Sequence, residues 1–239
     1  MRVTRLKYAH NDPIFYRVRG LDVISASNLE APRLLLEGKA DLAFVPVTLA
    51  AELDIPVLPR LAVYSVGPVI SARIFKGAGA SGYAAVSDTT VNARAAAKLL
   101  NISFERVDDP AAALARYKGV LVIGDDALRL VDRGVPHIAD VGELWQDKVG
   151  TPLVYAVLAA RPGLRPSEAE AIAEELENSL AAFYEDPAPV VKASAARLGV
   201  GERLMAEYFT RMKYFVNNEV LRGLEVEEEL LGLKRLRLI

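Results

Sequence analysis

The stretch Ser65-Val-Gly-Pro-Val-Ile-Ser-Ala-Arg-Ile-Phe75 decides the fold. An apolar run ends just before it at Val63-Tyr64, the chain turns at Gly67-Pro68, and a second apolar run begins at Val69. Such a junction leaves a hydroxyl group and backbone N–H groups at a strand end, where open α/β sheets bind ligands. A tight turn between two strands explains these residues equally well. Similar junctions recur along the chain, mostly before expected helices, and this recurrence favours a ligand-binding α/β protein.

Strand-like and helix-like segments alternate up to residue 160. The expected strands are 3–8, 21–24, 41–45, 55–64, 69–75, 83–86, 102–107, 119–123 and 153–160, and the expected helices include 28–37, 90–100, 110–117, 125–132 and 142–148. This alternation is typical of βαβ units and predicts largely parallel sheets. Right-handed crossovers then place the strand-to-helix loops on one edge of each sheet.

The pattern becomes purely helical after residue 163. Ser167 and Glu170 form a capping-box sequence with Ser167 as the N-cap. One apolar stripe then follows at helical spacing, at Ile172, Leu176, Leu180, Phe183 and Tyr184. Further helices are expected at 189–198, 202–215 and 218–231. We expect this tail to pack as scaffold.

Composition excludes several classes of protein. The chain has 239 residues, 52% of them hydrophobic, so it can bury a core as one large domain or two small ones. A net charge of −2 argues against a nucleic-acid surface. The absence of Cys excludes disulfides and thiol catalysis, and with only His10 and His137 we expect no zinc or other metal site. No apolar run approaches the roughly 20 residues of a membrane span, and no signal-peptide core is evident. These features predict a cytoplasmic protein without membrane partners.

Five junctions carry candidate binding residues. In the first, Asn11 or Asp12 is a natural N-cap before Pro13, or Asn11 presents its amide to a ligand. The second junction, at the start of another expected helix, favours a carboxylate or phosphate; its residues are Pro46, Val47 and Thr48. The third junction contributes Ser65, Gly67, Pro68 and Val69.

The last two junctions lie further along the chain. The fourth has more hydroxyl groups at a helix entry than capping needs, which favours an anion site; these residues are Ser87, Thr89 and Thr90. In the fifth, Gly124 permits close backbone approach and Asp125 can cap the next helix. No dinucleotide or P-loop motif is present.

Three junctions precede residue 78 and two follow it. We therefore expect two α/β lobes that face each other across a cleft and are joined by crossing strands, an architecture that closes by hinge motion. The predicted division places residues 1–77 and 159–239 in one lobe and residues 78–158 in the other.

An ordered set of motifs resembles the MqnA/MqnD family of the futalosine route to menaquinone. Over residues 8–161 the motifs are Asn11-Asp-Pro13, Leu35-Leu-Glu-Gly-Lys-Ala-Asp-Leu-Ala43, Ser65-Val-Gly-Pro-Val69, Ile123-Gly-Asp-Asp-Ala-Leu128, Asp140-Val-Gly-Glu-Leu-Trp145 and Gly150-Thr-Pro-Leu-Val-Tyr-Ala156. The resemblance implies the type II periplasmic-binding-protein fold, a small-molecule carboxylate substrate and no cofactor.

The family contains two chemistries. One member is a chorismate dehydratase that makes 3-[(1-carboxyvinyl)oxy]benzoate, and the other cyclises dehypoxanthine futalosine and uses a His late in its second lobe. Residues 123–130 contain no His and match the dehydratase pattern. The chain departs from the dehydratase near Thr89–Asn92, where that enzyme usually has Ser-Arg-Thr-Ser, so an Arg that would hold a carboxylate is missing.

The resemblance also implies roles for individual residues. It suggests a substrate-assisted route in which the substrate's own side-chain carboxylate takes the proton and Asn11 orients the substrate. Ser65, the Val69 N–H, Thr89 and Thr90 would hold carboxylates, and Tyr155 would stack or donate a hydrogen bond. The alternatives are a non-catalytic carboxylate-binding or sensor protein and a pathway enzyme with another substrate. The sequence is also compatible with a homodimer.

Overall fold

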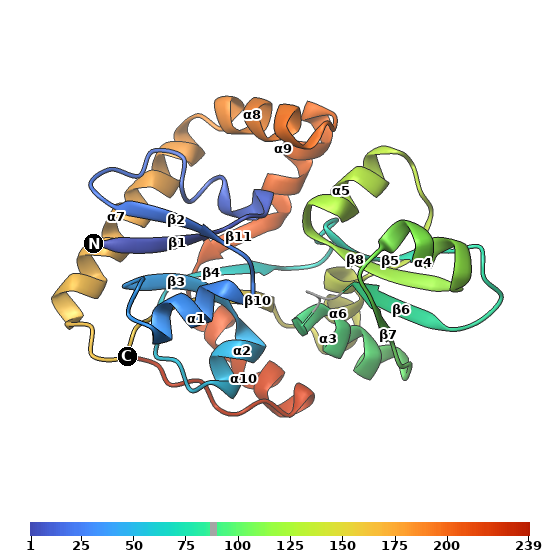
Figure 1. The fold of residues 1–239 in the computed structure, drawn as a ribbon, viewed down its shortest axis with the longest axis horizontal. Coiled ribbons are helices and arrows are strands. Elements are labelled where there is room, and N and C mark those ends of the chain that lie inside the picture. The colour runs from blue at the N-terminus through green and yellow to red at the C-terminus, as the bar shows by residue number, and fades with distance from the viewer. Residues whose placement is uncertain (87–89) are drawn as a thin grey trace.

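The computed structural model describes residues 1–86 and 90–239 and has two lobes, each built on one β-sheet (Figure 1). The first sheet has the strand order β11-β4-β10-β3-β1-β2 and the second has the order β7-β6-β8-β5-β9. The strands of the first sheet are β1 Arg2–Leu6, β2 Asp22–Ala26, β3 Leu42–Pro46, β4 Val57–Ser65, β10 Leu153–Ala160 and β11 Met212–Phe215. Those of the second are β5 Ala72–Lys76, β6 Tyr83–Val86, β7 Glu105–Val107, β8 Gly119–Ile123 and β9 His137–Asp140. The expected two-lobed α/β fold is confirmed.

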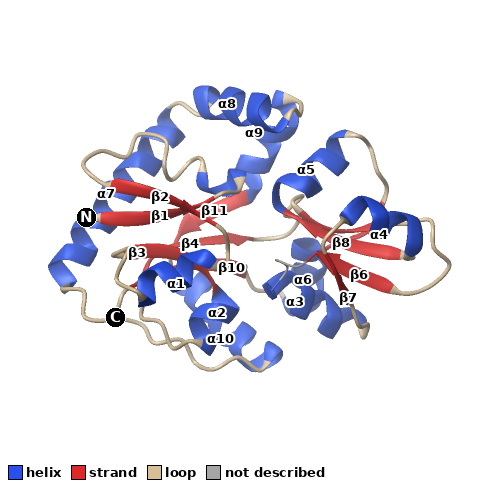
Figure 2. Ribbon diagram, in the orientation of Figure 1, coloured by secondary structure: helices blue, strands red, loops and turns tan. Residues whose placement is uncertain are grey.

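Helices cover both sheets (Figure 2). In the first lobe they are the short 3-10 helix η1 Ala9–Asn11, then α1 Glu30–Leu36, α2 Val47–Glu52, α7 Pro166–Glu185, α8 Ala188–Leu198, α9 Glu202–Arg211 and α10 Asn218–Leu231. In the second lobe they are α3 Thr90–Leu100, α4 Pro110–Arg116, α5 Gly124–Asp132 and α6 Val141–Val149. Helices α7 to α9 lie on one side of the first sheet and α1, α2 and α10 on the other (Figure 1). The C-terminal helices therefore belong to the first lobe.

The sheets are mixed, and the expectation of largely parallel sheets is wrong. Strand β1 is parallel to β2 and β3, and β6 is parallel to β7 and β8. The strands at the two crossings between the lobes pair antiparallel: β10 with β3 and β4, and β5 with β8 and β9. These strands enter their sheets straight from the other lobe rather than through a helical crossover, so their direction is not tied to the parallel set.

Strand pairing also shows where the chain changes lobes. It crosses between β4 and β5, at residues 66–71, and returns between α6 and β10, at residues 150–152. Strand β5 thus belongs to the second sheet, although the predicted division grouped residues up to 77 with the first lobe. We propose domain boundaries at these two crossings in place of residues 77 and 158.

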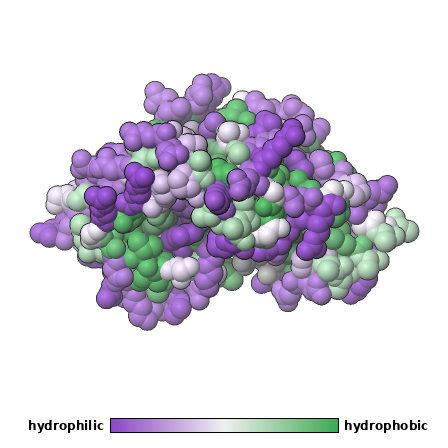
Figure 3. All heavy atoms as spheres, turned by 90° about the horizontal axis from the view of Figure 1, so that it is seen from above, coloured by the Kyte–Doolittle hydropathy of each residue, from purple (hydrophilic) through white to green (hydrophobic). Residues whose placement is uncertain are grey.

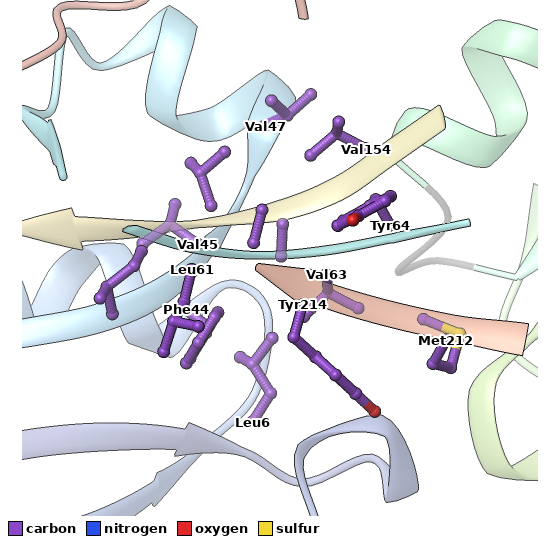
Figure 4. Close-up of a cluster of buried hydrophobic side chains, with 14 of the residues drawn as sticks. Leu6, Phe44, Val45, Val47, Leu61, Val63, Tyr64, Val154, Met212 and Tyr214 are labelled. Carbon is purple, nitrogen blue, oxygen red and sulfur yellow. The ribbon is translucent and has the colours of Figure 1, made fainter. Parts of the chain in front are cut away.

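Strand β8 shows why the apolar runs are continuous. Val120 and Val122 pack on the face of the second sheet that carries the core of that lobe, whereas Leu121 joins the larger core that continues into the first lobe. A strand that is covered on both faces is apolar at every position. Around β4 and β10, Figure 4 shows buried side chains of the first lobe, among them Val63, Val154 and, from β11, Met212.

The segment after β1 does not form the expected helix at Pro13. It forms η1 and then a series of turns. Neither expected cap is available, because Asn11 Oδ1 accepts a hydrogen bond from the Leu6 N–H and the Asp12 carboxylate pairs with Arg5 and Arg197. Side-chain bonds to other segments have replaced local capping.

Two further expectations fail in the C-terminal tail. Helix α7 begins at Pro166 with Arg165 as N-cap. The Arg165 N–H donates to the Glu168 carboxylate, so the expected capping box of Ser167 and Glu170 is wrong. The expected helix 202–215 ends at Arg211, and Met212–Phe215 forms β11 on the edge of β4. The stripe on α7 is confirmed except at its end, where Tyr184 is 48% exposed.

The surface seen from above is largely hydrophilic, with apolar patches on both halves (Figure 3). Within the described ranges, every helix is too short or too polar to cross a lipid bilayer.

Candidate functional site

A pocket lies between the two lobes and is lined by residues of both. It holds about 530 Å³ of space free of protein atoms, part of it open to solvent. The first lobe contributes Leu6, Tyr8, His10, Asn28 and Pro46, and the first sheet's strands β4, β10 and β11 contribute Val63, Tyr155, Ala156 and Met212. The crossing after β4 and the second lobe contribute Val69, Ser71, Ala72, Val91, Asn92, Ile123 and Gly124.

Few polar groups face this pocket, and those with unused hydrogen-bonding capacity are fewer still. The polar lining residues are Tyr8, His10, Asn28, Ser71, Asn92 and Tyr155. Among the lining residues that the structure describes, none is Arg or Lys. Within the same part of the chain, His10 Nε2 and Asn92 Oδ1 are buried without a hydrogen-bond partner. Buried polar atoms of this kind are costly unless a ligand or water satisfies them.

The first junction places His10, and not Asn11, in the pocket. Asn11 is completely buried and is absent from the lining, and its Oδ1 accepts from the Leu6 N–H at 2.9 Å. The neighbouring His10 lines the pocket, and its backbone carbonyl accepts from the Tyr214 hydroxyl at 2.9 Å. Figure 4 shows Tyr214 reaching from β11 toward this segment. Asn11 therefore fixes the loop that presents its neighbour.

The His10 ring packs against one aromatic ring and lies near a positive charge. It stacks on Tyr8 with ring centroids 5.6 Å apart. Burial, and next the positive charge of Arg5, lower the pKa of His10 to about 4. Its imidazole is therefore neutral at neutral pH.

Gly124 meets the Tyr8 ring across the gap between the lobes. A Cβ on Gly124 would lie 2.5 Å from Tyr8 Cδ1, and the residue has φ +65°. A side chain there would both strain the backbone and displace the ring. The sequence predicted that Gly124 permits a close approach to the backbone. In the structure the group that approaches is the Tyr8 ring of the same chain.

The third junction joins Ser65 to Tyr155. Ser65 is buried, and its Oγ lies 3.1 Å from the Gly67 carbonyl and 2.7 Å from the Tyr155 hydroxyl. Of Ser65 and Tyr155, only Tyr155 lines the pocket. Gly67 and Pro68 are also absent from the lining. Burial raises the pKa of Tyr155 well above its usual value, so the hydroxyl keeps its proton. Because the single Ser65 hydroxyl hydrogen goes to the Gly67 carbonyl, Tyr155 donates to Ser65 Oγ, and the Tyr155 oxygen can still accept a hydrogen bond from a ligand.

The same junction corrects the expectation for the Val69 N–H. This group donates to Asp140 Oδ1 at 2.9 Å, and the Ile70 N–H donates to Asp140 Oδ2 at 2.8 Å. The Val69 amide is therefore already bonded and is not a carboxylate donor; its side chain is what lines the pocket. Asp140, at the N-terminus of α6, also accepts from the Gly142 and Arg73 nitrogens.

Asp140 holds a strained turn at the edge of the pocket. Ile70 has φ +68°, which is rare for a β-branched residue, and the Ser71 N–H donates to the Val69 carbonyl at 2.8 Å to close a γ-turn around it. Strain of this kind persists only when the surroundings fix it, and it concentrates at functional sites.

The second junction contributes one residue to the lining. Pro46 faces the pocket, whereas Val47 and Thr48 are buried in α2 and are absent from the lining. Helix α2 has only six residues, and its start is covered. The exposed helix end that we expected there does not exist.

Part of the fourth junction lies outside the described residues. Ser87 and Thr89 fall there, and Thr90 is described only as the start of α3. The next two residues of that helix, Val91 and Asn92, line the pocket.

At the fifth junction, Asp125 joins the lobes. Its carboxylate accepts from the Ala9 N–H at 2.9 Å and from Arg197 Nη1 at 3.2 Å. Helix α5 has Ile123 at its N-cap and no side-chain cap, so the expected capping by Asp125 is wrong. Two further bonds of α5, from Arg129 to the Leu198 carbonyl and from Gly201 to Asp132, hold this helix to the first lobe. These contacts hold the two lobes together beside the pocket.

Sequence reasoning missed several lining residues. Asn28 follows β2 at a strand end, and the rule used for the other junctions would have found it. Ser71 and Asn92 lie close to candidates of the third and fourth junctions, but neither was itself predicted to bind a ligand. Met212 reaches the pocket only because β11 pairs with β4, and no local signal announces that pairing. Elsewhere in the described chain, no three His, Asp or Glu residues are grouped as a metal site would require.

A family model described as menaquinone biosynthesis matches residues 1–230. The chain belongs to this family. A relative, the chorismate dehydratase of Thermus thermophilus, is 29% identical, and the alignment covers 95% of this chain and 93% of that one. Residues from β1 to α10 thus share one family pattern, including the C-terminal helices.

Solved structures agree on the fold. Protein AF1704 from Archaeoglobus fulgidus has a TM-score of 0.74 at 19% identity, covering 97% of this chain and 96% of that one. The periplasmic aliphatic sulphonate binding protein SsuA from Escherichia coli has a TM-score of 0.67 at 12% identity, covering 97% and 85%. These similarities show a periplasmic-binding-protein fold.

Proposed function

We propose that this protein is a carbon–oxygen lyase that dehydrates chorismate to 3-[(1-carboxyvinyl)oxy]benzoate in menaquinone biosynthesis. The observation that carries the proposal is the similarity to a chorismate dehydratase over 95% of the chain, within a family of menaquinone biosynthesis. The interlobe pocket supports it, because residues of both lobes line one concave site of the kind that binds small molecules.

The chemistry is redox-neutral. A proton leaves a ring C–H, hydroxide leaves the neighbouring region of the ring, and the electron pair of the broken C–H bond enters the ring as it becomes aromatic. No electron acceptor is required. The protein's task is to position the substrate and to stabilise charge on the leaving oxygen, and positioning alone can contribute several kcal/mol to lowering the barrier.

The residues in and near the pocket support different roles in binding this substrate. The Tyr155 hydroxyl, oriented by its hydrogen bond to Ser65, would accept a hydrogen bond from the substrate hydroxyl. Tyr8, which lines the pocket and packs on Gly124 at the lobe interface, would cover the substrate ring. We propose that Asn11 acts as a positioning residue: its bond to the Leu6 N–H holds the loop that carries Tyr8 and His10.

A time course with purified protein tests this proposal. Chorismate should be converted to a compound lighter by one water, and conversion should saturate with substrate concentration. Binding of chorismate without any conversion would replace the enzyme by a carboxylate-binding or sensor protein. Cytoplasmic location and a homodimeric state belong to the proposal, and cell fractionation and light scattering test them.

A further inference from the structure

The interlobe pocket poses a problem of charge. Chorismate carries two carboxylates, and burying a carboxylate without a charged partner is costly. Among the described lining residues no side chain is a permanent cation. A lining side chain that can become positive would compensate this charge beyond what neutral O–H and N–H donors supply.

His10 is the lining residue that can do so. Of the ionisable side chains described around the pocket, Tyr8 and Tyr155 can only lose a proton, whereas an imidazole can gain one. His10 Nε2 is buried and has no hydrogen-bond partner in the described part of the chain. It is thus a buried hydrogen-bonding group of the pocket that is free to bind a ligand.

We propose that the His10 imidazole contacts a substrate carboxylate and takes up a proton as the substrate binds. This inference rests on the proposed function, which supplies the dianionic ligand. It assigns to His10 the substrate contact that the motif comparison suggested for Asn11.

The surroundings of His10 set the direction of the effect. Arg5 and burial keep the free imidazole neutral, with a pKa of about 4, so about one molecule in a thousand carries the charge at pH 7. Of the other groups packed nearby, Tyr8 stacks on the ring, Tyr214 bonds the His10 carbonyl, and Asp125 bonds the adjacent Ala9 N–H. A substrate carboxylate brings a negative charge into contact with the ring and raises its pKa.

The linkage has a definite sign. Between the pKa of the free imidazole and the higher pKa of the bound imidazole, binding consumes a proton, so affinity falls about tenfold for each unit of rising pH. Above the bound pKa the dependence ends. A neutral His10 that merely donates a hydrogen bond would give no such slope.

Calorimetry of product binding measures the proton directly. The probe is 3-[(1-carboxyvinyl)oxy]benzoate, which keeps both carboxylates and has already lost its water. Titrations at pH 6 in two buffers of different ionisation enthalpy should show proton uptake by the wild type. His10→Gln keeps a hydrogen-bonding group but cannot become charged, so it should show no uptake and bind about 10- to 100-fold more weakly at pH 6.

The second histidine is the matched control. His137 lies exposed on β9, and His137→Gln should behave as the wild type in both respects. Melting temperatures of the variants verify that each is folded. Absence of proton uptake by the wild type, or unchanged binding by His10→Gln, would overturn the inference while chorismate turnover still stood. Failure of the wild type both to convert chorismate and to bind the product would remove the proposed function, and the inference with it.

Discussion

Asp140 should be worth far more to stability than an ordinary helix cap. Its carboxylate is 1% exposed and accepts from the backbone N–H groups of Val69 and Ile70 as well as from α6. Asp140→Ala would leave the two crossing amides buried and unpaired, at about 1–3 kcal/mol each, and would remove a cap worth about 1 kcal/mol. We expect a loss of about 3–7 kcal/mol in the free energy of unfolding.

The matched control is the cap of another helix in the same lobe. Asp109 accepts from Ala111 and Ala112 at the start of α4 but bonds to no other segment in the described chain, and it is exposed. Asp109→Ala should therefore cost only about 1 kcal/mol. Asp140→Asn keeps one acceptor oxygen and should fall between the two alanine variants.

Urea unfolding followed by circular dichroism measures these differences. If Asp140→Ala is too unstable to purify, the comparison of Asp140→Asn with Asp109→Ala decides. Equal losses in the Asp140 and Asp109 variants would show that the crossing between the lobes does not depend on this carboxylate.

Two further predictions concern the lobe interface and a buried acid. Gly124→Ala should raise the KM for chorismate, because the new Cβ displaces Tyr8, whereas Gly134→Ala shares the positive φ but meets nothing within 4 Å and should leave KM unchanged; steady-state kinetics compare them. Glu227 is fully buried and burial raises its pKa, so its contribution to stability is present below about pH 4.5 and is lost as pH rises. Glu227→Gln should therefore gain stability over the wild type between pH 5 and pH 8 in urea titrations, and an unchanged difference would contradict this.

The sequence was sufficient for the α/β fold class and for two lobes, but not for the direction of the crossing strands. Alternating apolar strands and amphipathic helices indicate an α/β protein, and the ordered motifs resemble one family whose fold the structure shares. These signals are local or repeat many times, so single errors do not alter the outcome. Strand β11 is different: Tyr208, Met212 and Phe215 have helical spacing, while Met212 and Tyr214 alternate with exposed neighbours as in a strand. Only the free edge of β4 decides between them.

The sequence predicted which junctions reach the site, but not which of their side chains and backbone groups face it. All five junctions place at least one described residue in the pocket: His10, Pro46, Val69, Asn92 and Gly124. Which residue of a junction faces the ligand depends on partners that are remote in sequence. Asn11 turns away because the Leu6 N–H binds its side chain, and the Val69 N–H is taken by Asp140 from the second lobe.

The most direct test of the account is the fate of chorismate with the purified wild-type protein. Mass spectrometry should show chorismate disappearing as a product lighter by one water accumulates in equal amount, with an aromatic ultraviolet spectrum. Heat-denatured protein under the same conditions gives the uncatalysed background. Recovery of intact chorismate at the background rate, or formation of a product that has lost its enolpyruvyl group instead of water, would contradict the account.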